Sequence, residues 1–322
     1  MAPLSNNLLV SAILAYTVAM LAYAVEYTFG PRGLVNRVAT RELVAAGGPG
    51  PVVEEVPSPI TTATAPAAAP WVELAGRVAL AVTALGWALH LGSVVTRGMA
   101  AGRVPWGNMY EFVLTACLVG STAWLVAVIG RPTLRPVGLA VTLVLVLLLG
   151  VDGMLLYTAV GPLMPALHSY WLVIHVTAAV TASGVFLVGF VAAAMTLVRT
   201  GYDEGKVRFP YPLGGRLPEA DALERVTFRV HALGFPIWTF AVICGAIWAE
   251  AAWGRYWGWD PKETWAFIAW VIYAGYLHAR ATPSVKRTVA TWIAVLGWAA
   301  MMVNLFGVNL FVGGLHSYAG IK

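Results

Sequence analysis

The chain has little charge and almost no cysteine, and each shortage excludes a class of protein. Only 11% of its 322 residues are charged, whereas soluble globular domains carry about 25%. The two cysteines, Cys117 and Cys244, stand inside apolar runs, too few and too far apart for a zinc site or a C-x-x-C redox pair. The C-x-x-C-H attachment motif of c-type cytochromes is absent from the sequence. A soluble enzyme, a zinc protein and a c-type cytochrome are therefore excluded.

Apolar residues make up 59% of the chain and are grouped in runs near 20 residues long, the length that spans a bilayer as a helix. The sequence predicts an all-α integral membrane protein with about eight transmembrane helices. We expect spans near residues 8–24, 78–96, 112–129, 137–151, 170–198, 230–248, 264–278 and 289–311. The net charge of +5 resides in short loops between these spans, so it indicates orientation in the bilayer and no nucleic-acid partner.

Three segments follow from this pattern. Residues 1–28 hold the first span, which we interpret as a retained helix because no basic residue precedes its apolar run. Residues 29–74 are rich in proline and alanine without apolar periodicity, which predicts a flexible cytoplasmic linker. Residues 75–322 form the transmembrane core.

Basic residues predict which way the helices run. They cluster in four loops that fall on one side of the membrane if the spans alternate, and that side should be cytoplasmic. The opposite side receives both termini and the loop at residues 249–264. Arg97 and Arg103 are exceptions, because they fall on the outer side. The composition favours a bacterial cytoplasmic membrane over a thylakoid membrane.

The outer loop at residues 249–264 and its flanks hold five of the chain's 14 tryptophans. A belt of aromatic anchors would spread them over all loops. Trp253, Tyr256, Trp257 and Trp259 instead lie within seven residues, which predicts a flat apolar platform for a large planar ligand.

The end of this loop has a structural interpretation as well. Asp260, Pro261 and Glu263 match an N-cap, a first-turn proline and the third position of a capping box, so they can simply begin the next helix. Arg255 and Lys262 stand beside the platform. They are candidates for pairing with ligand carboxylates such as haem propionates, or else for reaching lipid headgroups.

Histidines inside a membrane are functional candidates by default. His175 near the outer end of the fifth span and His316 past the eighth lie at the depth of the tryptophan loop. Two neutral imidazoles are suitable axial ligands for haem iron, and His168 competes for this role. His278 lies about 21 Å deeper than Thr264 at 1.5 Å per residue, so it marks a second, inner site or caps its helix.

Several stretches resemble one known family. The run Trp253-Gly-Arg-Tyr-Trp-Gly-Trp-Asp-Pro-Lys-Glu263 resembles the tryptophan-rich WWD signature of haem-handling proteins. From about residue 75 onward the chain is similar to the CcsA/ResC branch, the membrane subunit of the System II cytochrome c synthase. The similar stretches are Pro105-Trp-Gly-Asn-Met-Tyr-Glu-Phe112, Leu167-His-Ser-Tyr-Trp-Leu-Val-Ile-His-Val176, Gly234-Phe-Pro236, Gly245-Ala-Ile-Trp-Ala249 and Gly314-Leu-His-Ser-Tyr318.

The resemblance implies a haem-handling function. Such proteins move haem b across the membrane and present it for thioether attachment to the C-x-x-C-H motif of apocytochrome c, acting with a CcsB/ResB-type subunit and, in some settings, thiol-reducing proteins. It implies that His175 and His316 ligate iron at the outer site, with Trp253, Tyr256, Trp257, Trp259 and Asp260 as the haem platform, and that His278 belongs to an inner site. His168 has no counterpart in the family motifs.

Two alternatives remain at this point. A haem exporter or chaperone with the same tryptophan loop would pass haem on without forming the bond. An unrelated channel or transporter would use the aromatics as membrane anchors and would purify without haem.

Overall fold

The computed structural model describes residues 1–30, 69–163 and 167–316, and within these ranges every regular element is a helix. Most of the predicted linker, residues 29–74, lies outside the described residues. Seven of the described helical stretches are long and apolar enough to cross a membrane. The prediction of an all-helical integral membrane protein is confirmed.

Short 3-10 and π-helical segments extend some of the spans. The spanning stretches are α1 (Ala2–Phe29), α3 (Pro70–Ala101), α4 (Met109–Gly130), η1 with α5 and η2 (Pro132–Val137, Gly138–Val151, Asp152–Leu156), α6 (Tyr170–Asp203), α7 (Ala220–Trp253) and α9 with η5 and α10 (Arg287–Met302, Val303–Gly307, Val308–Phe311). The predicted span at 264–278 corresponds to α8 (Pro261–Ala281), which packs against α7 and α9. Its 21 residues give about 31 Å at 1.5 Å per residue, although its aromatic and charged residues make it less apolar than the others.

The helix bounds differ most from the prediction on α7. The helix begins at Ala220, ten residues before the predicted span at 230–248, and ends at Trp253. The added inner turns are polar, so apolar length alone could not reveal them, and Glu224 there forms an ion pair with Arg280 of α8. At the outer end the predicted loop at 249–264 shortens to Gly254–Asp260, because helices enter it from both sides.

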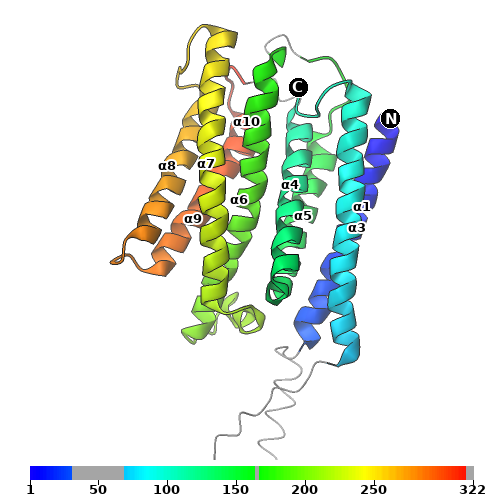
Figure 1. Cartoon of the computed structure of the whole chain (residues 1–322), viewed down its shortest axis with the longest axis vertical. Helices are drawn as coiled ribbons and strands as arrows, with labels where there is room; N and C mark the ends of the chain where they lie inside the picture. The colour runs from blue at the N-terminus through cyan, green and yellow to red at the C-terminus, as the bar shows by residue number, and fades with distance from the viewer. Residues whose placement is uncertain (31–68, 164–166, 317–322) are drawn as a thin grey trace, which may run out of the picture.

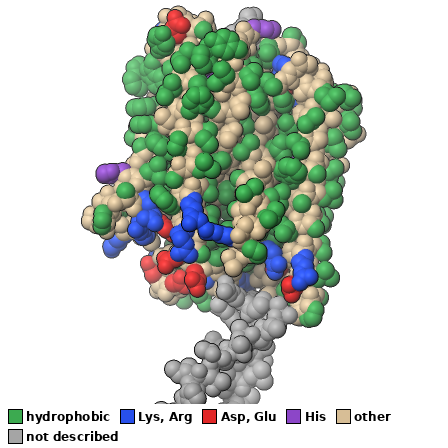
Figure 2. Space-filling model, in the orientation of Figure 1, with side chains coloured by type: hydrophobic (Ala, Val, Ile, Leu, Met, Phe, Trp, Pro, Cys, Tyr) green, Lys and Arg blue, Asp and Glu red, His purple; other side chains and the backbone are tan. Residues whose placement is uncertain are grey.

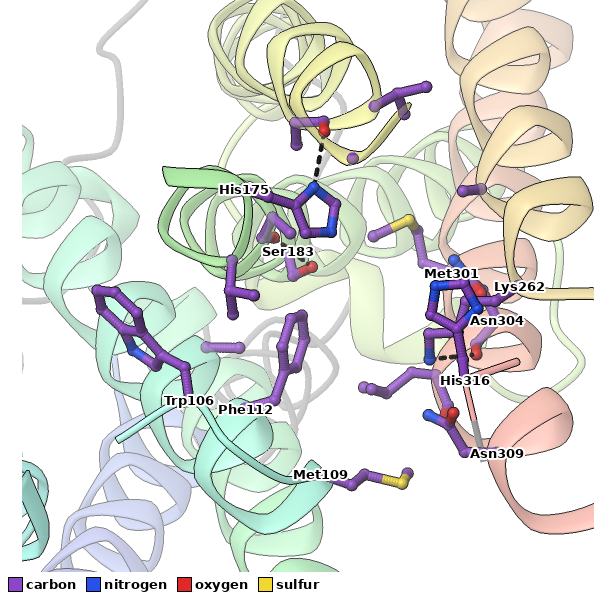
Figure 3. Close-up of a pocket in the computed structure, with 18 of the residues that line it drawn as sticks. Trp106, Met109, Phe112, His175, Ser183, Lys262, Met301, Asn304, Asn309 and His316 are labelled. Atoms are coloured by element: carbon purple, nitrogen blue, oxygen red, sulfur yellow. Dashed lines mark hydrogen bonds between the residues drawn. The ribbon is translucent and has the colours of Figure 1, made fainter. Parts of the chain in front are cut away.

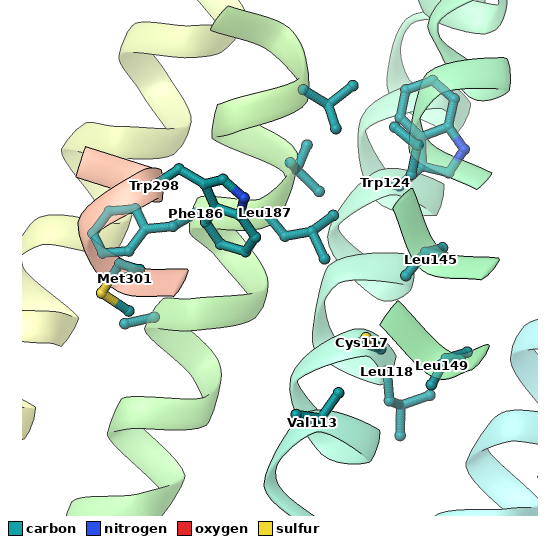
Figure 4. Packing of buried hydrophobic residues seen from close by; sticks show 14 of the residues in the cluster. Val113, Cys117, Leu118, Trp124, Leu145, Leu149, Phe186, Leu187, Trp298 and Met301 are labelled. Carbon is teal, nitrogen blue, oxygen red and sulfur yellow. The ribbon is translucent and has the colours of Figure 1, made fainter. Parts of the chain in front are cut away.

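The helices form two groups that meet between α4 and α6 (Figure 1). In one group α1 packs against α3 and α5; in the other, α6 packs against α7 and α9, and α8 against α9. Small residues permit the contact between the groups: a Cβ on Gly184 of α6 would lie 2.5 Å from the carbonyl oxygen of Ala116 on α4. The core runs across this contact and includes Val113, Cys117, Leu118, Trp124, Leu145, Leu149, Phe186, Leu187, Trp298 and Met301 (Figure 4).

The two ends of the bundle differ in charge. Most of the Lys and Arg side chains visible in Figure 2 gather near the lower end, where α6 connects to α7 and α8 to α9. The start of α1 and the connection between α7 and α8 lie toward the other end (Figure 1). This separation has the form that the basic-loop pattern predicts, with the tryptophan loop at the end opposite the basic loops. We call the end with the tryptophan loop the outer end and the end with the basic loops the inner end.

Candidate functional site

A large cavity opens beside the tryptophan loop, where the two helix groups meet (Figure 3). The empty space between its lining residues, including the open solvent at the mouth, is about 1570 Å³. Its walls come from α4 with the segment before it, α6, α7, the tryptophan loop, the start of α8, α9, η5, α10 and the segment after α10, with Leu148 of α5. Most of the lining is aliphatic or aromatic, so the cavity suits a large and mainly apolar ligand.

His175 enters the cavity from the second turn of α6, a helix that Ser169 caps by accepting a hydrogen bond from the Trp171 N–H. Its Nδ1 lies 2.8 Å from the carbonyl oxygen of Ala241 on α7. Space for the ring exists because residue 245 is glycine: a Cβ there would lie 2.8 Å from His175 Cε1. The imidazole is therefore oriented by α7 as well as by its own helix.

His316 enters the same cavity from the segment after α10, and Asp260 orients it. The His316 Nδ1 lies 2.7 Å from Asp260 Oδ2, and the Leu315 N–H donates to Asp260 Oδ1 at 2.8 Å. Asp260 is also the N-cap of α8 in a capping box with Glu263, as the sequence predicts. One buried carboxylate thus begins α8 and holds the end of the described chain against it.

Both members of this pair have pKa values below their usual ranges. Burial opposes ionisation of Asp260, but hydrogen bonds from the Leu315 N–H and from His316 outweigh burial and keep the pKa of Asp260 low. Burial lowers the pKa of His316, although the Asp260 contact opposes this. Asp260 is therefore ionised and His316 neutral near pH 7, the state in which an imidazole can bind a metal.

The two histidines share one arrangement. Each is placed to donate its Nδ1 hydrogen to an oxygen of the protein, which fixes the tautomer and makes Nε2 the atom that carries the lone pair. Metal-ligating histidines are commonly oriented in this way by a carbonyl or a carboxylate behind the ring. Figure 3 shows the two rings entering one cavity from different elements. The residues therefore fit a bis-histidine site for iron.

The tryptophan loop contributes to the cavity in part. Trp253, Tyr256 and Trp257 line it, whereas Trp259 and Asp260 are not among the lining residues. Trp257 and Trp259 are perpendicular, with ring centroids 5.7 Å apart. These rings therefore do not form the single flat surface that the sequence spacing suggests. Trp253 meets the ring of His316 edge to face, with centroids 5.1 Å apart.

The two basic candidates differ in their surroundings. Arg255 pairs with Glu263 at 3.4 Å and is not among the lining residues. Lys262 lines the cavity, and its Nζ donates to the carbonyl oxygen of Asn304 at 3.3 Å. Among the described residues Lys262 has no ion pair with a carboxylate. An ammonium group in an apolar cavity favours an anionic group on the ligand.

Several lining residues have polar atoms that would need a partner. The indole N–H groups of Trp106 and Trp248 and the Oδ1 of Asn304 are buried without a hydrogen bond within the described ranges. Trp248 also packs near His175, with ring centroids 5.7 Å apart. Buried polar atoms are normally satisfied, so these groups mark positions where a ligand or a water molecule binds.

The remaining histidines lie outside this cavity. His278 is exposed near the inner end of α8, and His168 is exposed before α6. His231 is buried with its ring 4.8 Å from that of Tyr276, so it does not share the exposed surroundings of His278. His90 of α3 is buried with Nε2 2.9 Å from the carbonyl oxygen of Leu114 on α4, so it forms a hydrogen bond between two helices.

The sequence predicted that His175 and His316 lie at the same end of the bundle as the tryptophan loop, but it did not predict the contacts that orient them. The Asp260–His316 contact joins positions 56 residues apart. The role of Gly245 was visible only as a motif glycine. Trp106, Met109 and Phe112 belong to a stretch that resembles the family, but nothing in the sequence predicted that they form a wall of the cavity.

Comparisons with known proteins identify the family to which the chain belongs. The family model described as cytochrome C assembly protein matches residues 106–316, which include both cavity histidines. The cytochrome c biogenesis protein CcsA of Thermosynechococcus vestitus is 33% identical over 288 residues, covering 77% of this chain and 88% of the relative. The protein of the same name from Guillardia theta is 34% identical over 247 residues, covering 70% and 80%.

A solved structure shares the fold. Cytochrome c haem lyase CcmF superposes with a TM-score of 0.59 at 15% sequence identity, over 95% of this chain and 46% of that chain. The present chain thus spans about half the length of that protein, and the likeness concerns the arrangement of helices. The family model and the relatives together settle the classification: the chain belongs to the cytochrome c assembly protein family, as a CcsA-type cytochrome c biogenesis protein.

Proposed function

We propose that this chain is the haem-handling subunit of a cytochrome c synthase. It moves haem b across the membrane and presents it on the outer side for thioether attachment to the C-x-x-C-H motif of an apocytochrome c. The observation that supports this best is the pair His175 and His316, which enter one large apolar cavity with Nδ1 held by Ala241 and Asp260. The chain's family membership supports the same assignment.

In this proposal the protein contributes positioning. Each thioether forms when a thiol S–H adds across a vinyl C=C: sulfur bonds to one carbon and the proton goes to the other, without net oxidation. His175 and His316 hold the iron, while the apolar walls exclude water and fix the haem edge for the thiols, which raises their effective concentration. Because the client's own histidine becomes an iron ligand, one of the two cavity histidines must be exchangeable.

Lys262 and Arg255 take different parts in the proposal. Lys262 faces the cavity without a carboxylate partner among the described residues, and we assign it to a haem propionate. Arg255 is paired with Glu263, so it contacts a propionate only if that pair opens. Trp253, Tyr256 and Trp257 pack against the haem, while Asp260 acts behind His316 and Trp259 is exposed outside the cavity lining.

An inner haem site completes the path. His278 is exposed near the inner end of α8, a position from which it can share a haem with a second protein. We assign that protein to the CcsB/ResB type, with thiol-reducing proteins keeping the client cysteines reduced. The chain is a multi-pass membrane protein, and we place it in a bacterial cytoplasmic membrane with the tryptophan loop and both termini outside.

The test is maturation of a reporter cytochrome. This chain, a CcsB/ResB-type subunit and a C-x-x-C-H apocytochrome are produced together in a bacterium without its own maturation system, and covalent haem is measured on denaturing gels. We expect covalent haem with the wild type and with His168→Ala, whose side chain is exposed outside the cavity. The His175→Ala, His316→Ala double variant should give none.

The outcomes separate the alternatives. Haem bound by the wild type and delivered outside without a covalent product would identify a haem exporter or chaperone and overturn the synthase assignment. A wild type that takes up no haem at all, even with the partner present, would overturn haem handling altogether.

A further inference from the structure

Two arginines and a glutamate form a cluster of buried ion pairs at the outer end of the bundle, beside the cavity. The side chains of Arg97 on α3 and Glu111 on α4 are fully buried, with Arg97 Nε 3.0 Å from Glu111 Oε1. Arg103, from the segment between these helices, places Nη1 2.7 Å from Glu111 Oε2. Arg97 also donates to the carbonyl oxygen of Thr158 at 2.6 Å, which ties in the segment after η2.

Glu111 also binds the backbone of the segment that precedes α4. The Gly107 N–H donates to Glu111 Oε2 at 2.8 Å, and the Asn108 side chain caps α4 by accepting from the Glu111 N–H at 2.8 Å. Arg103 packs closely over residue 107, since a Cβ added there would lie 2.6 Å from Arg103 Nη2. The path of the chain from Arg103 to Met109 is thus fixed by one carboxylate.

This segment forms a wall of the cavity. Trp106, Gly107, Asn108 and Met109 all line it, and Phe112 follows one turn into α4. Figure 3 shows Trp106, Met109 and Phe112 along the side of the cavity across from His175. The carboxylate of Glu111 itself points away from the cavity, toward the arginines, and is not among the lining groups.

Stability alone is a poor reason for this cluster. Replacing a buried ion pair with well-packed apolar side chains is often neutral or stabilising, because charges are costly to desolvate. Arg97 and Arg103 also oppose the basic-loop pattern that orients the other helices. The cost of burying these charges is explained if the protein needs the geometry that they impose. A charge network with several defined hydrogen bonds fixes the positions of the joined segments more closely than apolar contacts do.

We propose that Glu111 is a positioning residue, which uses Arg97 and Arg103 to hold the Trp106–Met109 segment as the fixed wall of the ligand cavity. The role of the wall in haem binding rests on the proposed function: the wall packs against the haem on the side of the cavity across from His175 and holds the haem close to the two histidines.

The experiment compares Glu111→Gln with Glu26→Gln. The Glu26–Arg135 pair joins α1 to η1 at the other end of the bundle and takes no part in the cavity, so its loss is the control, although this pair is less buried than that of Glu111 and Arg97. The two cysteines serve as reporters that need no haem. Cys117 lines the cavity, whereas Cys244 is also buried but does not line it. Labelling of each by N-ethylmaleimide is followed by mass spectrometry in the purified full chain.

We expect Glu111→Gln to speed labelling of Cys117 by at least about tenfold, since a buried charge loses its partner, and to leave Cys244 unchanged. Glu26→Gln should change neither. Equal Cys117 labelling in the two variants would overturn the proposal. If Glu111→Gln does not accumulate, Arg103→Met, which keeps the Arg97–Glu111 pair, should raise Cys117 labelling in the same direction, and an unchanged rate would count equally against the proposal.

A second readout uses haem b itself. Transfer of haem from the loaded chain to apomyoglobin should be faster for Glu111→Gln than for Glu26→Gln. Faster cysteine labelling without faster haem release would show that Glu111 holds the cavity wall only in the absence of haem. That result would contradict its part in haem binding. A wild type that binds no haem would overturn the proposed function, while the labelling result would still decide the role of Glu111.

Discussion

The outer and inner ends of the chain hold histidines in opposite circumstances. At the outer end, His175 and His316 enter one cavity, and each is oriented through Nδ1 by another part of the same chain. At the inner end, His278 is exposed, and no hydrogen bond to its ring is seen in the part of the chain that the structure describes. An oriented imidazole loses little freedom on binding a metal, whereas an unrestrained one must be fixed by its ligand or partner. In the proposed function, the outer site is therefore complete within this chain, whereas the inner site takes part of its ligand set from another protein.

Removing the orienting carboxylate at the outer end should have a large effect. Asp260→Asn keeps a good N-cap for α8 but weakens the acceptor behind His316. Loss of such a partner typically costs about 10- to 100-fold in metal affinity, so we expect haem affinity to fall by that factor in an absorbance titration, with little change in Tm. Asp203→Asn, which disturbs an exposed pair with Arg199, is the control. Unchanged haem affinity in Asp260→Asn would show that His316 does not need this carboxylate.

Crowding the other outer histidine should have a smaller effect. Gly245→Ala places a methyl group 2.8 Å from His175 Cε1. Overpacking of this kind costs roughly 1–3 kcal/mol. Because the His175 ring can move away from the added methyl group, we expect the lower end of that range, about fivefold in haem affinity, with altered ligation in the absorption spectrum. Gly275→Ala on α8, where the added Cβ meets open space, is the matched control. If both variants bind haem alike, the contact between α7 and His175 does not govern ligation.

The inner histidine should give the smallest effect in the isolated chain. His278→Ala should leave haem content and spectrum unchanged when the chain is purified alone, because the ring lies outside the cavity. With a CcsB/ResB-type subunit present, the same variant should lose the haem shared with that partner. If His278→Ala lost haem when the chain was purified alone, the difference between the outer and the inner histidines would be contradicted.

Much of the bundle could be predicted because its determinants are local. The apolar runs predicted the helices. The start of α8 was predicted from the capping pattern of Asp260, Pro261 and Glu263. The depth of His175 and His316 followed from their places at helix ends. Helix α7 was predicted too short, because its inner turns are polar and are held by the tertiary contact of Glu224 with Arg280.

The finer geometry of the site could not be predicted, because it depends on contacts between distant segments. The Asp260–His316 bond joins α8 to the end of the described chain. The tryptophan loop does not form the flat aromatic platform that the spacing predicts. Trp259 has a positive φ of 58°, and its ring is perpendicular to that of Trp257. Arg255 was a candidate for a ligand carboxylate, but its neighbour Glu263, eight residues on, pairs with it.

The most direct test of the central claim is the absorption spectrum of haem b bound to the purified chain, compared with that of the His175→Gly, His316→Gly double variant with and without added imidazole. We predict a six-coordinate, bis-histidine spectrum in the wild type, its loss in the double variant, and its return when imidazole occupies the space of the missing rings. A double variant that keeps the wild-type haem content and spectrum without imidazole would contradict the assignment of His175 and His316 as the iron ligands.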